Sequence, residues 1–166
     1  MKDSQMIQQL YEAYGKELFL YLFSMCQSRE LSEDLLQETY VKALLSLSVQ
    51  HGNMRAWLYL VARNLCLNAL KKEKRRFPAE IPDVPDGEAG ILEQFIKKEQ
   101  NRMLYRAMAR LPSRKREILQ LQYFSGLPLR EIAEILRVSP ENVRVLSHRA
   151  KQELKKYLKE DGYGIS

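Results

Sequence analysis

The chain has 166 residues, of which 45% are hydrophobic and 29% are charged. Only seven glycines and six prolines interrupt stretches rich in Leu, Glu, Lys, Arg and Gln, so the composition predicts an all-α protein. The net charge of +6 is compatible with a nucleic-acid partner. No stretch approaches the roughly 18 apolar residues of a membrane span, and the acidic N-terminal sequence argues against a signal peptide.

Residues that could do chemistry are sparse. Cys26 and Cys66 lie far apart without a CxxC pattern, so we expect reduced, packed thiols. His51 and His148 have no partner at ligand spacing, which argues against a metal site. Because no Ser/His/Asp set or Gly-rich phosphate loop is present, we expect no catalytic residue, no cofactor and no small-molecule substrate.

Charge divides the chain into three parts. Residues 63–76 hold six Lys or Arg and one acid, a net of +5, whereas residues 77–95 hold five acids and no base, a net of −5. The acidic segment also contains three of the six prolines, which is typical of an irregular linker. We therefore predict two small helical domains, residues 1–76 and 96–166, joined by an acidic flexible linker at 77–95.

The first domain is predicted to contain helices at about 4–26, 32–47 and 54–75, with a polar loop at 48–53. Ser32 is expected to cap the second helix, with acids in its first turn. The spacing of Leu36, Tyr40, Ala43 and Leu47 predicts the buried stripe of this helix.

The opposite side of the second helix carries Asp34, Gln37, Glu38, Val41 and Leu45. Carboxylates beside apolar groups are typical of a docking face for a basic partner helix. In the other interpretation the acids are solvated while Val41 and Leu45 pack under the first helix. Spacing alone leaves both open.

The third helix is expected to direct one set of residues inward: Met54, Trp57, Leu58, Val61 and Leu65. It directs a second set outward: Tyr59, Arg63, Cys66 and Leu70. Its end is basic, from Lys71 and Lys72 through Lys74, Arg75 and Arg76. Aromatic groups beside such a run suit unpaired bases and phosphates. The alternative, favoured for Trp57 taken alone, makes this residue part of the core and the basic run a solvated helix end.

In the second domain we predict helices at 99–110 and 114–124, the second capped by Ser113, and then a helix-turn-helix at 127–154. Pro128 is placed at the first helical position. Inward residues at helical spacing are Leu129, Ile132, Ala133 and Leu136, then Val143, Leu146, Ala150 and Leu154.

The turn Arg137-Val138-Ser139 is expected to insert Val138 into the core and to cap the next helix with Ser139. The outer face of that helix carries Glu141, Asn142, Arg144, Val145, His148, Arg149 and Gln152. A polar, Arg-bearing face at the start of a second helix is suited to reading base edges in a major groove. A plain helical hairpin is the alternative.

Three stretches together resemble the extracytoplasmic-function (ECF) sigma factors of the sigma-70 family, which are bacterial transcription initiation factors. They are SEDLLQETYVKAL at 32–44, MRAWLYLVARNLCLNALKKEKR at 54–75 and ARLPSRKREILQLQYFSGLPLREIAEILRVSPENVRVLSHRA at 109–150. The resemblance implies an alternative sigma factor that binds core RNA polymerase and directs promoter recognition, DNA melting and initiation. Residues 1–76 would form its region 2-like domain and 96–166 its region 4-like domain.

The resemblance also implies the site residues. Core polymerase, through the clamp helices of its largest subunit, would meet Asp34, Leu35, Gln37, Glu38 and Val41. The −10 element, with one base flipped into the 48–53 loop, would meet Asn53, Arg55, Trp57, Tyr59, Arg63, Lys71 and Lys72. The −35 element would meet Glu141, Asn142, Arg144, Val145, His148 and Arg149.

Further partners implied by the family are the polymerase flap region and an anti-sigma protein, which can hold a cytoplasmic factor near the membrane. The acidic linker would thread a basic channel of the polymerase. A free-standing helix-turn-helix regulator that binds an operator is the competing class, but no dimerisation heptad supports it.

Three positions depart from the family pattern. Arg137 stands where Gly is usual, so the turn must accommodate a side chain. Leu146 and Ser147 stand where Arg and Leu are common, and we expect Ser147 to bond back to the carbonyl of Val143. Pro128 replaces a capping Ser.

Overall fold

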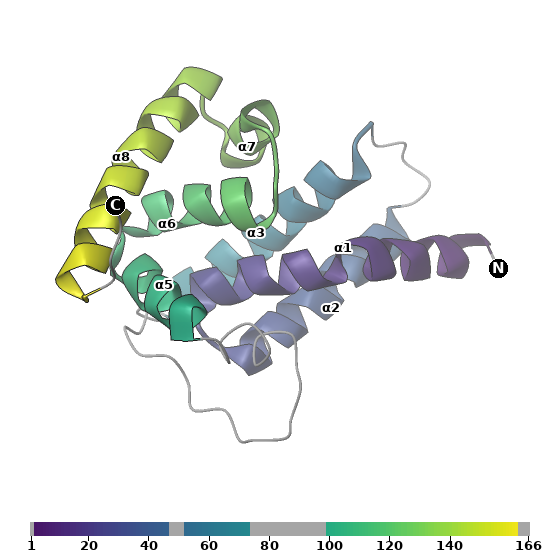
Figure 1. Cartoon of the computed structure of the whole chain (residues 1–166). Coiled ribbons are helices and arrows are strands. Elements are labelled where there is room, and N and C mark those ends of the chain that lie inside the picture. The colour runs from purple at the N-terminus through teal and green to yellow at the C-terminus, as the bar shows by residue number, and fades with distance from the viewer. Residues whose placement is uncertain (1, 47–51, 74–98, 163–166) are drawn as a thin grey trace.

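The computed structural model describes residues 2–46, 52–73 and 99–162, and every regular element within these ranges is helical. Figure 1 shows the chain order. The N-terminal group consists of α1 (Lys2–Cys26), α2 (Arg29–Leu45) and α3 (Met54–Glu73). The C-terminal group consists of α5 (Glu99–Arg110), α6 (Ser113–Leu119), the π-helix η1 (Gln120–Phe124), α7 (Leu129–Leu136) and α8 (Pro140–Glu160). The all-α prediction is confirmed, while the predicted linker and loop residues 48–51 lie outside the described residues.

In the N-terminal group, α1 packs along α2, and α3 contacts both helices. The predicted stripe of α2 is buried at Leu36, Tyr40 and Ala43, and the Tyr40 hydroxyl donates to the carbonyl of Leu10 at 3.0 Å. Leu47 lies outside the described residues. Because one face of α2 packs on both neighbouring helices, its opposite face is left to solvent.

The start of α2 corrects the predicted cap. Gln27 adopts a left-handed conformation (φ 55°), and Ser28 then accepts the N–H of Leu31 at 3.1 Å. The helix therefore begins at Arg29, and its cap at Ser28 lies four residues before the predicted cap at Ser32. Ser32 is fully buried within the first turn, where its hydroxyl donates to the carbonyl of Ser28 at 2.7 Å.

The helix-turn-helix prediction is confirmed at α7 and α8. Arg137 takes a left-handed conformation (φ 58°, ψ 45°), so the turn does accommodate a side chain. Val138 packs against the core, and Ser139 caps α8 by accepting the N–H of Asn142 at 3.1 Å. Pro128 occupies the N-cap position of α7, one residue before the predicted place.

Two other local predictions in the C-terminal group are wrong. Ser113 is the first residue of α6 and makes no capping bond, because Pro112 holds the cap position. Ser147 is buried, and its hydroxyl donates to the side chain of Gln122 rather than to the carbonyl of Val143. The widened turns of η1 bring Gln122 into reach of α8, which helical spacing does not reveal.

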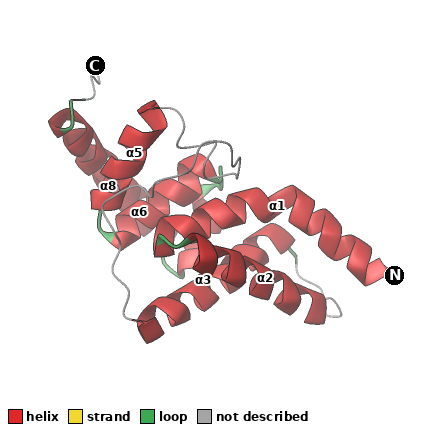
Figure 2. Cartoon of the chain, turned by 90° about the horizontal axis from the view of Figure 1, so that it is seen from below, coloured by secondary structure: helices red, strands yellow, loops and turns green. Residues whose placement is uncertain are grey.

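The two groups pack against each other, as the two perpendicular views show (Figures 1 and 2). One continuous core joins Leu18 and Tyr21 of α1 to Ile118 of α6 and Ile132 of α7. The largest interhelix contact between the groups links α3 to α7. Consequently α3 is covered on two sides.

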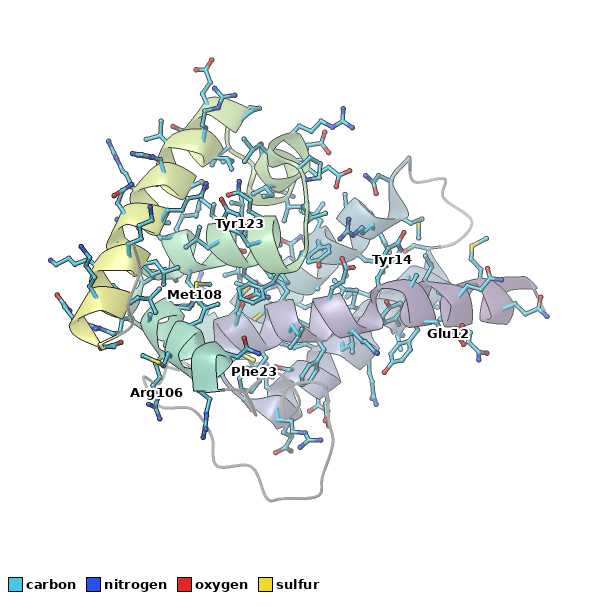
Figure 3. All side chains as sticks on the ribbon, in the orientation of Figure 1. Glu12, Tyr14, Phe23, Arg106, Met108 and Tyr123 are labelled. Carbon is cyan, nitrogen blue, oxygen red and sulfur yellow. The ribbon has the colours of Figure 1, made fainter. Side chains whose placement is uncertain are left out.

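At the other end of this junction, a small apolar cleft of about 30 Å³ lies between α1 and the helices α5 and α6. Phe23 and Met108, labelled in Figure 3, line it from opposite groups. The guanidinium of Arg116, also in the lining, donates to the carbonyl of Ser24 at 3.1 Å. Burial lowers the pKa of Arg116 to about 10.

Candidate nucleic-acid interface

The exposed side of α2 is acidic and apolar together. Asp34, Gln37 and Glu38 are exposed, and Val41 and Leu45 have 54% and 77% of their surface in solvent. The interpretation that packed Val41 and Leu45 under the first helix is therefore wrong. We call these five residues the α2 face. Such a surface can bind a helix that presents both basic and apolar side chains.

Leu35 does not belong to the α2 face. Only 4% of its surface is exposed, because it points into the core between the helices of the N-terminal group. The resemblance groups Leu35 with Asp34, but its position in the helical repeat places it beside the buried Leu36. Leu35 can hold α2 in place but cannot present its side chain to a partner.

The outer side of α8 is as exposed as the sequence predicts. We call its residues the α8 face: Glu141, Asn142, Arg144, Val145, His148 and Arg149. Beside it, a depression of about 230 Å³ is lined by Arg144, His148 and Lys151, among others. A convex helix with exposed guanidinium groups has the shape and charge that fit a DNA major groove.

Lys151 was missed by the sequence analysis. Its ammonium lies 5.0 Å from the ring centroid of Tyr123, an exposed aromatic residue on η1. Lys151 follows Arg144 by seven residues, so helical periodicity could have placed it on this side of α8. Tyr123 gave no comparable signal, because its position depends on the π-helix.

The start of α3 carries Asn53, whose side-chain oxygen accepts the N–H of Ala56 at 3.1 Å and so caps the helix. Its amide nitrogen donates to the carboxylate of Glu131 on α7 at 2.7 Å. Next to it, a groove of about 320 Å³ is lined by residues of both groups. Its lining consists of Gly52, Asn53, Ala56, Trp57, Leu60, Glu134 and Ile135.

Arg55 is held by both groups. Its guanidinium forms an ion pair with Glu17 of α1 at 2.7 Å and donates to the carbonyl of Ser125, just after η1. Burial lowers the pKa of Arg55, but the hydrogen bond and charge of Glu17 outweigh it, so the pKa is raised overall. The cation is thus already occupied by protein groups.

Tyr59 corrects the predicted orientation of α3. It was expected to face outward, yet it is fully buried because α3 is packed between α1 and the C-terminal group. Its hydroxyl donates to the carboxylate of Glu17 at 2.8 Å and lies 2.7 Å from the hydroxyl of Ser125. Burial raises the pKa of Tyr59 far above its usual value.

Arg63 is likewise turned toward the C-terminal group. Its Nε lies 2.7 Å from the carboxylate of Glu117 on α6, and the two side chains are only 12% and 5% exposed. The hydroxyl of Tyr21 donates to the same carboxylate at 2.5 Å. Burial lowers the pKa of Arg63, but Glu117 raises it by more, so the guanidinium stays charged.

The remaining predicted residues of α3 are divided between solvent and core. Lys71 and Lys72 are exposed, and Trp57 is half-buried at the edge of the core and lines the groove. Cys66, predicted to face outward, is fully buried, and a hydrogen bond to Cys26 together with burial raises the pKa of its thiol. Lys74, Arg75 and Arg76 lie outside the described residues.

Comparisons with known proteins match both groups. The family model of sigma-70 region 2 matches residues 10–76, and that of sigma-70 region 4 matches residues 101–154. The RNA polymerase sigma factor YlaC of Bacillus subtilis is 33% identical over 165 residues, which cover 94% of each chain. The ECF RNA polymerase sigma factor SigM of the same species is 30% identical over 155 residues, covering 90% of this chain and 93% of that protein.

The chain belongs to the ECF RNA polymerase sigma factors. It is accordingly an alternative sigma factor that directs transcription initiation, and the relatives that it matches are sigma factors, which are not enzymes. Within the described residues, no helix of this sigma factor is long and apolar enough to cross a bilayer.

Solved structures show the same fold. CnrH, in complex with the cytosolic domain of CnrY, superposes on this ECF sigma factor with a TM-score of 0.73 at 21% identity, covering 95% of this chain and 90% of that chain. RpoE of Bartonella quintana, in complex with the anti-sigma factor NepR, also gives a TM-score of 0.73, at 22% identity, covering 96% and 98%.

Proposed function

We propose that this sigma factor binds core RNA polymerase through the α2 face. The observation that carries the proposal is the combination of exposed Asp34 and Glu38 with exposed Val41 and Leu45 on one side of one helix. The clamp helices of the polymerase are the intended partner, and the flap region is a second contact. The carboxylates would steer a basic helix into place, and the apolar groups would lose water on contact.

The two other surfaces are assigned to promoter DNA. Asn53, Arg55, Tyr59 and Arg63, which we call the α3 face, would receive the separated −10 strand together with Trp57, Lys71 and Lys72. On the N-terminal side of the groove, Asn53, Ala56 and Trp57 would line the place of the flipped base. The α8 face would read the −35 element. In this division residues 1–76 and 96–166 act as separate domains on DNA, joined by the acidic linker at 77–95.

No chemical step is assigned to the protein itself. Opening of the duplex would be driven by binding energy, since extruding and unstacking a base costs a few kcal/mol. The proposal includes promoter DNA and core polymerase as partners, a cytoplasmic site of action, and no cofactor or small-molecule substrate. An anti-sigma protein is included because CnrH and RpoE of Bartonella quintana are seen with CnrY and NepR.

Run-off transcription with purified core polymerase over a promoter library tests the proposal. We expect promoter-dependent transcripts only when this sigma factor is added, and the selected promoters give both DNA elements. A protein that binds a DNA site without core polymerase and yields no transcript would instead be a free-standing regulator. That result would refute the proposed function.

A further inference from the structure

Three surfaces were assigned above, and they differ in what covers them. The α2 face and the α8 face are open to solvent. Most of the α3 face is covered by the C-terminal group, where Ser125 contacts Arg55 and Tyr59 and Glu117 contacts Arg63. Glu131 contacts Asn53, whose side chain stays exposed at the rim. Only one of the two DNA-binding surfaces is therefore hidden.

The side chains that cover the α3 face offer oxygen acceptors, as the DNA strand that they would exclude does. Glu117 places a carboxylate 2.7 Å from Arg63, as a phosphate oxygen would lie. Glu131 accepts a hydrogen bond from the side-chain amide of Asn53. That amide could otherwise donate to a base edge or to a phosphate oxygen. Ser125 completes the set by bonding to Arg55 and Tyr59. The C-terminal group, together with Glu17 of α1, thus satisfies the donors that a DNA strand needs.

This packing is also substantial. The carboxylate of Glu117 joins Arg63 to Tyr21 in a buried network, and the core beneath is continuous across both groups. Removing one partner of a buried ion pair is costly, because the other charge is left without compensation. The closed arrangement is therefore a defined state rather than a loose encounter.

We propose that the free sigma factor masks its own −10 surface: the C-terminal group occupies the α3 face until polymerase engages the open α2 face. This inference rests on the assignment of the α3 face made in the proposed function. It gives an order of events, since polymerase and the −35 element find open surfaces while the separated strand does not. The apparent affinity for single-stranded DNA is reduced by the fraction of molecules that are open.

Two measurements on the full chain test the masking without polymerase. Spin labels at Lys42→Cys on α2 and Lys156→Cys on α8, both exposed positions, report the distance between the groups. The native thiols are buried and react slowly. Binding of a short fluorescein-labelled oligothymidylate reports access to the α3 face, because stacking and phosphate contacts tolerate any sequence.

The decisive variant is Glu117→Gln, which keeps the shape but removes the charge opposite Arg63. We expect a longer and broader distance distribution and about tenfold tighter oligothymidylate binding. The matched control is Glu153→Gln, which removes a 2.7 Å ion pair to Lys115 inside the C-terminal group and should change neither reading. Glu131→Gln, at the rim of the junction, should tighten binding about twofold.

The proposal is overturned if labelled wild-type chain shows separated groups, or if Glu117→Gln and Glu131→Gln bind the oligonucleotide no better than wild type. Circular dichroism shows whether Glu117→Gln remains folded. If this variant does not fold, the spin-label distance in the wild-type chain and the oligothymidylate affinity of Glu131→Gln test the masking instead. Run-off transcription separates the two hypotheses. Transcription with unchanged oligonucleotide binding would refute masking alone, whereas absence of transcription from wild type would refute the proposed function.

Discussion

Helices α2 and α3 lie next to each other and yet stand in opposite relations to solvent. On α2, the side opposite the buried stripe stays open, and its acids and Val41 and Leu45 are exposed. On α3, the corresponding side is covered, and Tyr59 and Cys66 are fully buried. Hydrophobic spacing identifies the most apolar side of a helix, which is buried. Whether a second side is also buried depends on segments far away in the chain.

The largest expected effect is at the open helix. The double substitution Asp34→Lys, Glu38→Lys should weaken binding to core polymerase about a thousandfold, because it reverses two charges on the α2 face. Both positions are exposed, so the free energy of unfolding should change by no more than about 0.5 kcal/mol.

Glu12→Lys with Asp161→Lys is the matched control, since both acids are exposed and neither lies on α2. Titration of each labelled double variant with core polymerase measures its binding affinity. Equal affinities of the two double variants would show that the open side of α2 does not bind core polymerase.

The next effect tests the covered helix. Ile135 is buried where α7 meets Trp57 and Leu60 of α3. Ile135→Ala should lower the free energy of unfolding by about 2–5 kcal/mol, whereas Leu45→Ala on the open side of α2 should stay within about 0.5 kcal/mol. Urea denaturation measures both. A cost for Ile135→Ala as small as that for Leu45→Ala would show that the junction is not packed in solution.

A smaller effect distinguishes the two arginines of the α8 face. Arg144→Ala should cost about 1–3 kcal/mol at one position of the −35 element if this guanidinium contacts a base. Arg149→Ala should instead weaken binding to all DNA sequences by the same factor, as expected for a phosphate contact. Binding to a set of single-base variants of the selected promoter measures this. A uniform loss for Arg144→Ala would assign it to phosphate.

The smallest effect appears only in alkali. Burial and Glu117 raise the pKa of Tyr21, and burial raises that of Tyr59, above the ordinary value of 10. Stability from these protonated hydroxyls is present below pH 10 and is lost as the pH rises above it, because the unfolded chain releases its protons first.

Urea denaturation across this range should show a shallower alkaline loss for the double variant Tyr21→Phe, Tyr59→Phe than for wild type. Tyr11→Phe, at an exposed tyrosine, is the control and should keep the wild-type slope. Identical slopes for all three proteins would argue against a role of the buried hydroxyls at the junction.

The helical repeat and capping residues predicted most of the fold. Ser139, Val138 and the buried stripes of α7 and α8 follow from contacts close in sequence, and they are confirmed. What the sequence did not reveal depends on distant partners. The pairing of Ser147 with Gln122 needs the π-helix, and the burial of Tyr59 needs the C-terminal group. The sequence therefore predicted the exposure of the candidate residues on α8 but not the burial of Tyr59 and Arg63 on α3.

Arg137 illustrates how a strained position can carry a useful group. The residue is exposed in the bend before α8, with a backbone conformation that costs an L-amino acid roughly 1–2 kcal/mol. Glycine would adopt the same bend without steric strain. The protein instead retains a cation at this bend, so replacing Arg137 with glycine would relax the backbone but remove a positive charge from the edge of the surface that we propose reads the −35 element.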